Sequence, residues 1–180
     1  MNRRAVILVN GVPASGKSTL ARMISTRRQF PLLTLDRVKE PFFEHLGAGD
    51  REYNRKLGRA SYRAIFDLIG DFPHGSTSVV DAWFGFQPIE VLRSHLERND
   101  IGRVIQIWCA SSPATVTARY AARLSSRPAG HPGADYLPEL TALAERARPF
   151  PDFPTLALET DQAIDDTSTL AWIEAALRAI

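Results

Sequence analysis

Residues 11–19 read Gly-Val-Pro-Ala-Ser-Gly-Lys-Ser-Thr, a spacing of glycine, lysine and hydroxyl groups that suits a phosphate chain. The two glycines, Gly11 and Gly16, let the backbone turn tightly, so that successive N–H groups point at an anion. Lys17 supplies a point charge for β- and γ-phosphates, and the Ser18 hydroxyl is a ligand for Mg²⁺. We therefore expect this P-loop to hold a nucleoside triphosphate and its magnesium ion. The expected contacts come from Gly11, Ala14, Ser15, Gly16, Lys17, Ser18 and Thr19.

The P-loop lies between a strand pattern and a helix pattern, which is the context that the motif requires. The apolar run 5–9 precedes it, and residues 17–28 continue it with helical periodicity. A helix that begins at Lys17 adds the positive end of its dipole to the site. The alternative is a glycine-rich turn that binds nothing, and the strand–loop–helix context argues against it.

The rest of the chain alternates between strand and helix patterns. This alternation predicts an α/β fold in three layers, with helices on both sides of a mostly parallel sheet. Strands are expected near 5–9, 31–35, 77–81, 103–109 and 155–159, and helices near 17–28, 37–46, 52–70, 88–98, 113–125, 137–147 and 167–179. Breaks rich in Pro and Gly at 125–133 and 148–154 bound a segment, about 125–150, that we expect to form a lid.

Two aspartates follow predicted strands, at the sheet edge where such folds bind ligands. Asp36 is placed to accept a proton from a substrate hydroxyl as it attacks the γ-phosphate. The alternative is that Asp36 caps a helix that opens at Arg37. Asp81 closes an apolar strand and is expected to hold Mg²⁺ through water beside Ser18, or else to serve as a turn residue.

Aromatic side chains follow Asp81 directly. Trp83, Phe84 and Phe86 are expected either to line an acceptor pocket, together with Asp36 and Asp81, or to pack under a loop.

Arginines recur at helical spacing in two places. Arg119, Arg123 and Arg127 share one face if their helix continues, where they would bind triphosphate oxygens; the alternative is a solvated face. A second set recurs every four residues and forms either a basic solvent face or a grip on an anionic acceptor. It consists of Arg51, Arg55, Arg59 and Arg63, opposite Leu57, Ala64, Ile65, Leu68 and Ile69.

Composition excludes several other classes. The 180 residues are 44% hydrophobic and 23% charged with a net charge of +2, as in an ordinary globular domain. The single cysteine, Cys109, is expected to be buried and inert in a reducing cytoplasm. No apolar run is long enough to span a membrane, and no cluster has the spacing of a zinc site. We assign no chemistry to His131.

Taken together, the P-loop, Asp36 and the run Val80-Asp81-Ala82-Trp83-Phe84 resemble the P-loop kinases of small molecules and of nucleic-acid ends. The similarity is greatest to chloramphenicol phosphotransferase, zeta-toxin-type kinases and polynucleotide kinases. It implies a five-stranded parallel sheet in the order 2-3-1-4-5, MgATP as donor, an arginine-bearing lid, and Asp36 as general base. Glu159-Thr160-Asp161 and Thr167-Ser168 resemble that family's last strand and the loop near the adenine. One departure is Arg37, which stands where a second acidic residue is common.

The resemblance implies a cytoplasmic, ATP-dependent kinase that acts on a hydroxyl of an antibiotic-, sugar- or nucleoside-like acceptor. We expect one domain, 1–180, with acceptor-side helices at about 37–72, and with Asp36, Lys17 and Arg123 as catalytic residues. One alternative is a 5′-hydroxyl polynucleotide kinase that uses the 51–63 arginines. Another is an ATPase switch without a small-molecule acceptor. The acceptor and the oligomeric state are left open.

Overall fold

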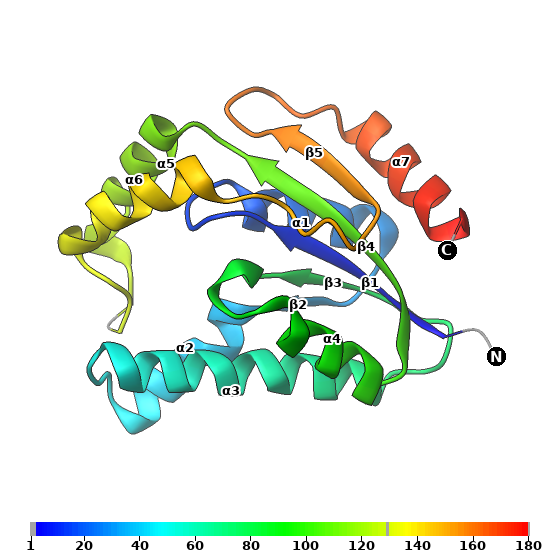
Figure 1. Ribbon diagram of the computed structural model, residues 1–180, viewed down its shortest axis with the longest axis horizontal. Helices are drawn as coiled ribbons and strands as arrows, with labels where there is room; N and C mark the ends of the chain where they lie inside the picture. Colours follow the sequence, from blue (N-terminus) through cyan, green and yellow to red (C-terminus); the bar gives the residue numbers. More distant parts are fainter. Residues whose placement is uncertain (1–2, 129, 180) are drawn as a thin grey trace.

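The computed structural model describes residues 3–128 and 130–179 and contains a five-stranded parallel sheet in the order β2-β3-β1-β4-β5 (Figure 1). This confirms the predicted order. The strands are β1 (Arg4–Asn10), β2 (Leu32–Thr34), β3 (Thr77–Asp81), β4 (Ile101–Ala110) and β5 (Thr155–Glu159). The helices are α1 (Lys17–Arg28), α2 (Leu35–Leu46), α3 (Arg51–Gly70), α4 (Ile89–Arg98), α5 (Pro113–Ala121), α6 (Leu137–Arg146) and α7 (Asp166–Ala179).

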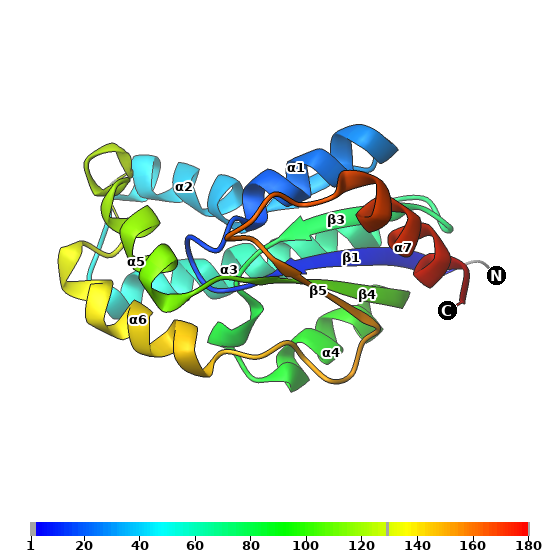
Figure 2. The same ribbon diagram turned by 90° about the horizontal axis from the view of Figure 1, so that it is seen from above.

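Helices cover both faces of the sheet, because the central strands are apolar on both sides. All seven residues of β1 are buried, and alternate side chains enter different cores. Val6 and Leu8 pack with α3 and α4, whereas Ile7 packs with α1 and α7. Figure 2 shows α1 and α7 on one side of the sheet and α4 on the other. The predicted three-layer arrangement is therefore confirmed.

The strand register brings the predicted chemical residues to one edge. Thr34, at the end of β2, pairs with Asp81, and Asp81 pairs with Val9, which lies just before the P-loop. The carboxyl ends of the strands thus collect the P-loop, Asp81 and the start of α2. The chain order reverses around β1, and ligands of open α/β sheets bind at such a point.

A third apolar cluster joins α5 and α6 to the P-loop. Val116 and Tyr120 of α5 and Leu140 of α6 pack with Val12 of the P-loop. In Figure 1, α5 and α6 lie at the side toward which the strand arrows point. The two helices therefore stand beside the nucleotide loop, as a lid would.

Two helix boundaries differ from the expectation in ways that matter for the site. Helix α2 begins at Leu35, before Asp36, and α5 ends at Ala121, so Arg123 and Arg127 lie beyond it. A short 3₁₀ turn, Leu124–Ser126, follows α5. Within the described residues, no helix combines the length and apolar character needed to cross a membrane.

Candidate active site

The P-loop curls around its own backbone as the glycine spacing predicts. Three residues have left-handed φ angles: Gly11 at 151°, Ala14 at 68° and Gly16 at 87°. A Cβ on Gly11 would lie 2.6 Å from the Ser15 Oγ, so glycine is required there for space as well as conformation. The N–H groups of Gly11 and Ser15 already donate to the Asn10 Oδ1 and the Val12 carbonyl oxygen, so the later loop amides and the N-terminus of α1 are the donors for an anion.

Lys17 folds back over the loop that precedes it. Its Nζ donates to the Val12 carbonyl oxygen at 2.8 Å, and its side chain is buried. Burial lowers the pKa of the ammonium, while the charge of Asp81 opposes that shift. A phosphate group at this loop would favour the charged form further.

Asp81 and Ser18 form the candidate magnesium position. Asp81 is only 4% exposed, and burial raises the pKa of its carboxyl. Lys17 and a hydrogen bond from the Ser18 hydroxyl favour the carboxylate instead. Carboxylate and hydroxyl oxygens are hard ligands of the kind that Mg²⁺ prefers, and here they lie in direct contact. The residues present therefore fit the ion: Ser18 would be a direct ligand, and Asp81 would act through water.

Asp36 lies in the first turn of α2, and the helix-cap alternative is wrong. The N-cap position belongs to Thr34, because α2 already includes Leu35. Asp36 is exposed, and its charge acts on Lys17 and Asp81 on one side. The Asp36 side chain is therefore accessible, and it lies close enough to Lys17 and Asp81 for its charge to act on both.

The first two of the three aromatic residues after Asp81, Trp83 and Phe84, have different surroundings. Phe84 is 1% exposed and meets the Tyr62 ring at 5.7 Å, in the core beneath the sheet. Its surroundings are those of the packing alternative, and its ring offers no open surface to an acceptor. Trp83 is partly buried and packs with the cluster of Val12, α5 and α6. Of the pair, Trp83 is the one that lies beside the lid.

The three lid arginines do not share a helical face, because α5 ends before the second of them. Arg119 donates from Nη2 to the Thr160 carbonyl oxygen at 2.8 Å, beside the P-loop. Arg123 is exposed, and its charge acts on Lys17. Arg127 lies over the Tyr120 ring of α5 at 4.5 Å, and its charge acts on Lys39 of α2. The predicted common triphosphate surface is thus divided between two sides of the site.

The comparisons with known proteins can now be set beside this geometry. A family model described as an AAA domain matches residues 6–135, which include the P-loop, both aspartates and all three lid arginines. The chain belongs to that AAA domain family. No curated protein matches the chain.

Several solved structures share the fold of this AAA domain. A protein from Chloroflexus aurantiacus, described as a candidate kinase, has a TM-score of 0.84 at 24% identity, over 98% of this chain and 100% of that one. A gluconokinase from Sinorhizobium meliloti has a TM-score of 0.61 at 17% identity, over 99% and 93% of the two chains. A shikimate kinase from Bacteroides thetaiotaomicron has a TM-score of 0.59 at 15% identity, over 97% and 98%. At these identities the similarity establishes a shared fold.

A buried hydrogen-bond network beneath the P-loop of the AAA domain was missed by the sequence reasoning. The Asn10 Oδ1 accepts from the backbone N–H of Gly11 at 2.8 Å and of Phe84 at 3.2 Å. Its Nδ2 donates to the Gln106 Oε1 at 2.9 Å. One side chain thus holds the start of the P-loop against the segment that follows Asp81. Two polar residues, Asn10 and Gln106, within apolar strands were the available signal.

The loop after β5 closes the back of the nucleotide site. The Thr160 hydroxyl lies 2.7 Å from the Ser15 carbonyl oxygen and 2.8 Å from that of Ala110. Asp161 accepts from the Ser111 hydroxyl and from the backbone N–H of Ser112, and these bonds lower the pKa of its carboxyl to about 2. This segment therefore ties β5 to the P-loop and to the start of α5.

The loop that carries Arg127 and His131, within the segment predicted to form a lid and called the lid loop below, contacts α2 through His131. Sequence reasoning gave His131 no role. The His131 Nε2 lies 3.0 Å from the Glu40 Oε1, and its Nδ1 lies 2.9 Å from an Arg127 nitrogen. Because the guanidinium only donates, Nδ1 must accept, and the proton sits on Nε2. His131, Glu40 and Asp36 lie close enough together to suggest a metal site. The assigned tautomer leaves no Nε2 lone pair for a metal, so we read the cluster as a docking contact.

The arginines along α3 are partly engaged in ion pairs. The Arg51 Nη2 lies 2.6 Å from the Glu139 Oε2, which links α3 to α6, and Arg63 pairs with Asp67 at 3.2 Å. Leu68, expected on the apolar face, is 48% exposed, so that part of the expectation is wrong. Ile65 and Ile69 pack in the core as predicted, whereas Leu57 and Ala64 are only partly buried.

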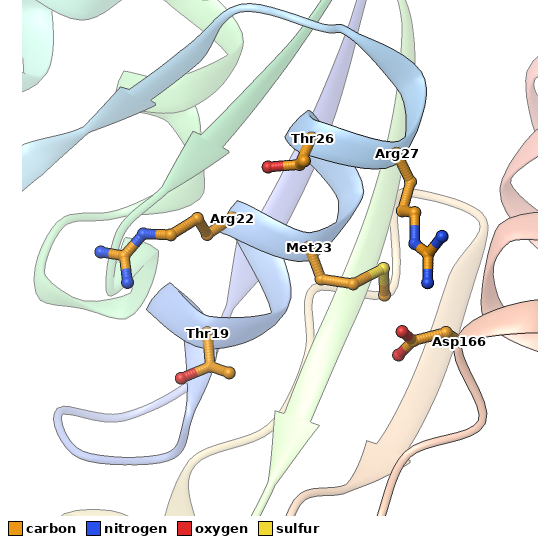
Figure 3. A pocket seen from close by; sticks show the side chains of 6 residues that line it. All are labelled: Thr19, Arg22, Met23, Thr26, Arg27 and Asp166. Carbon is orange, nitrogen blue, oxygen red and sulfur yellow. The ribbon is translucent and has the colours of Figure 1, made fainter.

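A shallow groove of about 330 Å³ runs along the outer face of α1 toward the start of α7. Figure 3 shows Arg27 and Asp166 pointing toward one another across it, while Arg22 points away. Thr19, expected to contact the nucleotide, lines the groove at the P-loop end of α1. The groove lies apart from Asp36 and α2.

Proposed function

We propose that this chain is a phosphotransferase that moves the γ-phosphate of ATP to a hydroxyl group of a small-molecule acceptor. The fold and the family agree with a P-loop enzyme, and the names of the structural neighbours are those of kinases. The observation that carries the proposal is the convergence of Lys17, Asp81 and Asp36. Thr34, two residues before Asp36, pairs with Asp81, and Asp81 pairs with Val9 just before the P-loop, so the charge of Asp36 acts on both of the others.

The nucleotide side of the site is supplied by the P-loop and the lid. Lys17 and the loop amides hold the β- and γ-phosphates, and Ser18 and Asp81 hold Mg²⁺, which neutralises charge on the phosphate oxygens. Arg123 adds positive charge beside Lys17. Because charge stabilisation is the main task in phosphoryl transfer, these cations carry most of the catalytic effect.

The acceptor side is supplied by α2, α3 and the lid segment of about 125–150. Asp36 is exposed at the start of α2 and takes the proton of the attacking hydroxyl. Trp83 offers an aromatic surface between the P-loop and the lid. We treat residues 1–180 as one kinase domain, with acceptor-side helices within about 37–72. If Asp36 activated only a water molecule, the chain would be an ATPase, and this is the alternative function to test.

The test is transfer of the labelled γ-phosphate of ATP to a panel of alcohols. The panel holds aminoglycosides, chloramphenicol, sugars, nucleosides and 5′-hydroxyl oligonucleotides, with release of free phosphate followed in the same samples. Label in one acceptor class supports the kinase and names its substrate. Label in free phosphate alone, across the panel, favours the ATPase switch. The acceptor class that gains label also decides whether the narrower resemblance to chloramphenicol phosphotransferase holds.

A further inference from the structure

Two cationic side chains, Lys39 and Arg127, gather beside Asp36 from different segments. Lys39 lies on α2, one turn after Asp36, and Arg127 lies in the lid loop. Each charge lies over an aromatic ring: the Lys39 Nζ is 4.9 Å from the centre of Phe43, and the Arg127 Cζ is 4.5 Å from that of Tyr120. In the described parts of the chain, neither forms an ion pair with a carboxylate.

The surroundings of Lys39 hold it in place rather than neutralise it. Its stem passes Gly58 of α3, where an added Cβ would lie 4.0 Å from the Lys39 Cδ. Burial and the charge of Arg127 both lower the pKa of the Lys39 ammonium, while Asp36 and Glu40 raise it. Of the two carboxylates, Asp36 raises the pKa of Lys39 more than Glu40 does. The carboxylate that most favours the charged ammonium is therefore the proposed general base.

The groups that hold Arg127 likewise do not neutralise its charge. Its bond to the His131 Nδ1 is to a neutral imidazole, because the ring accepts there and donates from Nε2 toward Glu40. Glu40 is engaged by His131 rather than by either cation. The result is two half-buried positive charges that act on each other with no anion bound directly to either. Such a pair is unfavourable alone and becomes favourable when an anion joins both.

We propose that Lys39 and Arg127 bind a phosphate or carboxylate group of the acceptor, so that the acceptor is an anionic alcohol whose hydroxyl faces Asp36. This proposal rests on the proposed kinase function and restricts the class of acceptor to anionic alcohols. Arg51 and Arg63 of α3 are weaker candidates, because each is already paired with a carboxylate. Arg127 is held near α2 through His131, which bonds to Glu40.

The first test measures anion binding directly, with the P-loop already filled. The protein is saturated with Mg²⁺ and a non-hydrolysable ATP analogue, and inorganic phosphate or acetate is then titrated while amide NMR shifts are followed. The variants are Lys39→Met, which keeps the apolar stem, and Arg127→Gln. Lys56→Met is the matched control, because Lys56 is exposed on α3 and pairs with Glu52 at 3.0 Å. We expect at least about tenfold weaker anion binding in both site variants and no change in the control.

The outcomes separate this proposal from the kinase itself. Binding of phosphate but not acetate identifies a phosphorylated acceptor, and the reverse identifies a carboxylate. Equal anion affinity in Lys39→Met and the unmodified chain, or no affinity for either anion in the unmodified chain, overturns the proposal. Failure of the ATP analogue to bind would reject the nucleotide site instead, and the comparison of Lys39→Met with the unmodified chain would still report on the anion site.

The second test uses transfer to matched alcohols that differ only in an anionic group, such as glycerol and glycerol phosphate. The unmodified chain should prefer the anionic member. Lys39→Met and Arg127→Gln should raise its KM by about tenfold or more, whereas Lys56→Met should leave that KM unchanged. Equal use of both members by the unmodified chain would overturn the anionic acceptor and leave the kinase proposal standing.

Discussion

Lys17 and Asp81 are each the strongest charged neighbour of the other at the floor of the candidate site. Burial lowers the pKa of Lys17 and raises the pKa of Asp81, so it disfavours the charged form of both groups. Each charge in turn favours the charged form of the other group. The arrangement keeps a cation for phosphate and an oxygen ligand for Mg²⁺ within one buried region. Removing either charge should therefore affect the binding of both the phosphate group and Mg²⁺.

Lys17→Met should abolish phosphate transfer, with a loss of at least about a hundredfold, because the β- and γ-phosphates lose their point charge. It also leaves Asp81 buried without its main counter-charge, so ATP affinity should fall as well. Binding of a fluorescent ATP analogue and the transfer rate are the measurements. Lys56→Met should change neither quantity. Full transfer activity in Lys17→Met would mean that this loop does not hold the reacting nucleotide.

Asn10→Leu should lower the free energy of unfolding by about 2–4 kcal/mol, because it leaves two buried backbone N–H groups without their acceptor. Urea denaturation followed by circular dichroism measures this. Gln162→Leu, at an exposed turn, serves as the control and should stay within about 0.5 kcal/mol. An equal effect of the two substitutions would show that the Asn10 network does not support the P-loop.

Gly130→Ala should weaken docking of the lid loop on α2. Gly130 has a φ of 90°, and an added Cβ would lie 2.8 Å from the Phe43 ring. The control is Gly47→Ala, where φ is 79° and an added Cβ meets nothing within 4 Å. Both variants carry backbone strain, so their difference isolates the clash with Phe43. Limited proteolysis near residues 125–133 should be faster in Gly130→Ala than in Gly47→Ala, and equal rates would contradict the docking.

Cys109 should resist thiol reagents in the folded chain. It is 1% exposed, and burial raises the pKa of its thiol from 9.0 to about 12. Labelling at pH 8 should be slow in buffer and fast in urea. Because the folded pKa is the higher one, the stability that the neutral thiol contributes is present below pH 9 and is lost as the pH rises toward 12. Rapid native labelling would contradict the burial.

The P-loop and most element boundaries were predictable, because they depend on local signals. Glycine spacing, apolar runs and helical periodicity all act within a few residues, and the family resemblance supplied the strand order. The start of α2 was misplaced because Asp36 is a favoured cap residue, yet Thr34 takes that position. The end of α5 at Ala121 was missed because no glycine or proline marks it.

The contacts that shape the acceptor side could not be predicted from the sequence. Glu40 and His131 are 91 residues apart, and their contact depends on how the lid loop settles on α2. Asn10 and Gln106 are 96 residues apart and meet through the pairing of β1 with β4. Lys39 looked like an ordinary helix residue, and its importance comes from the ring beneath it and the arginine beside it.

The most direct test of the account compares Asp36→Asn with Asp71→Asn, an exposed aspartate at the end of α3, in transfer from ATP to the acceptor that the panel identifies. The amide cannot take the hydroxyl proton, so the account predicts a loss of about 10²-fold or more in kcat for Asp36→Asn. ATP affinity should be unchanged, and Asp71→Asn should match the unmodified chain. Near-full transfer by Asp36→Asn would contradict the assignment of Asp36 as the general base and, with it, the proposed acceptor side of the site.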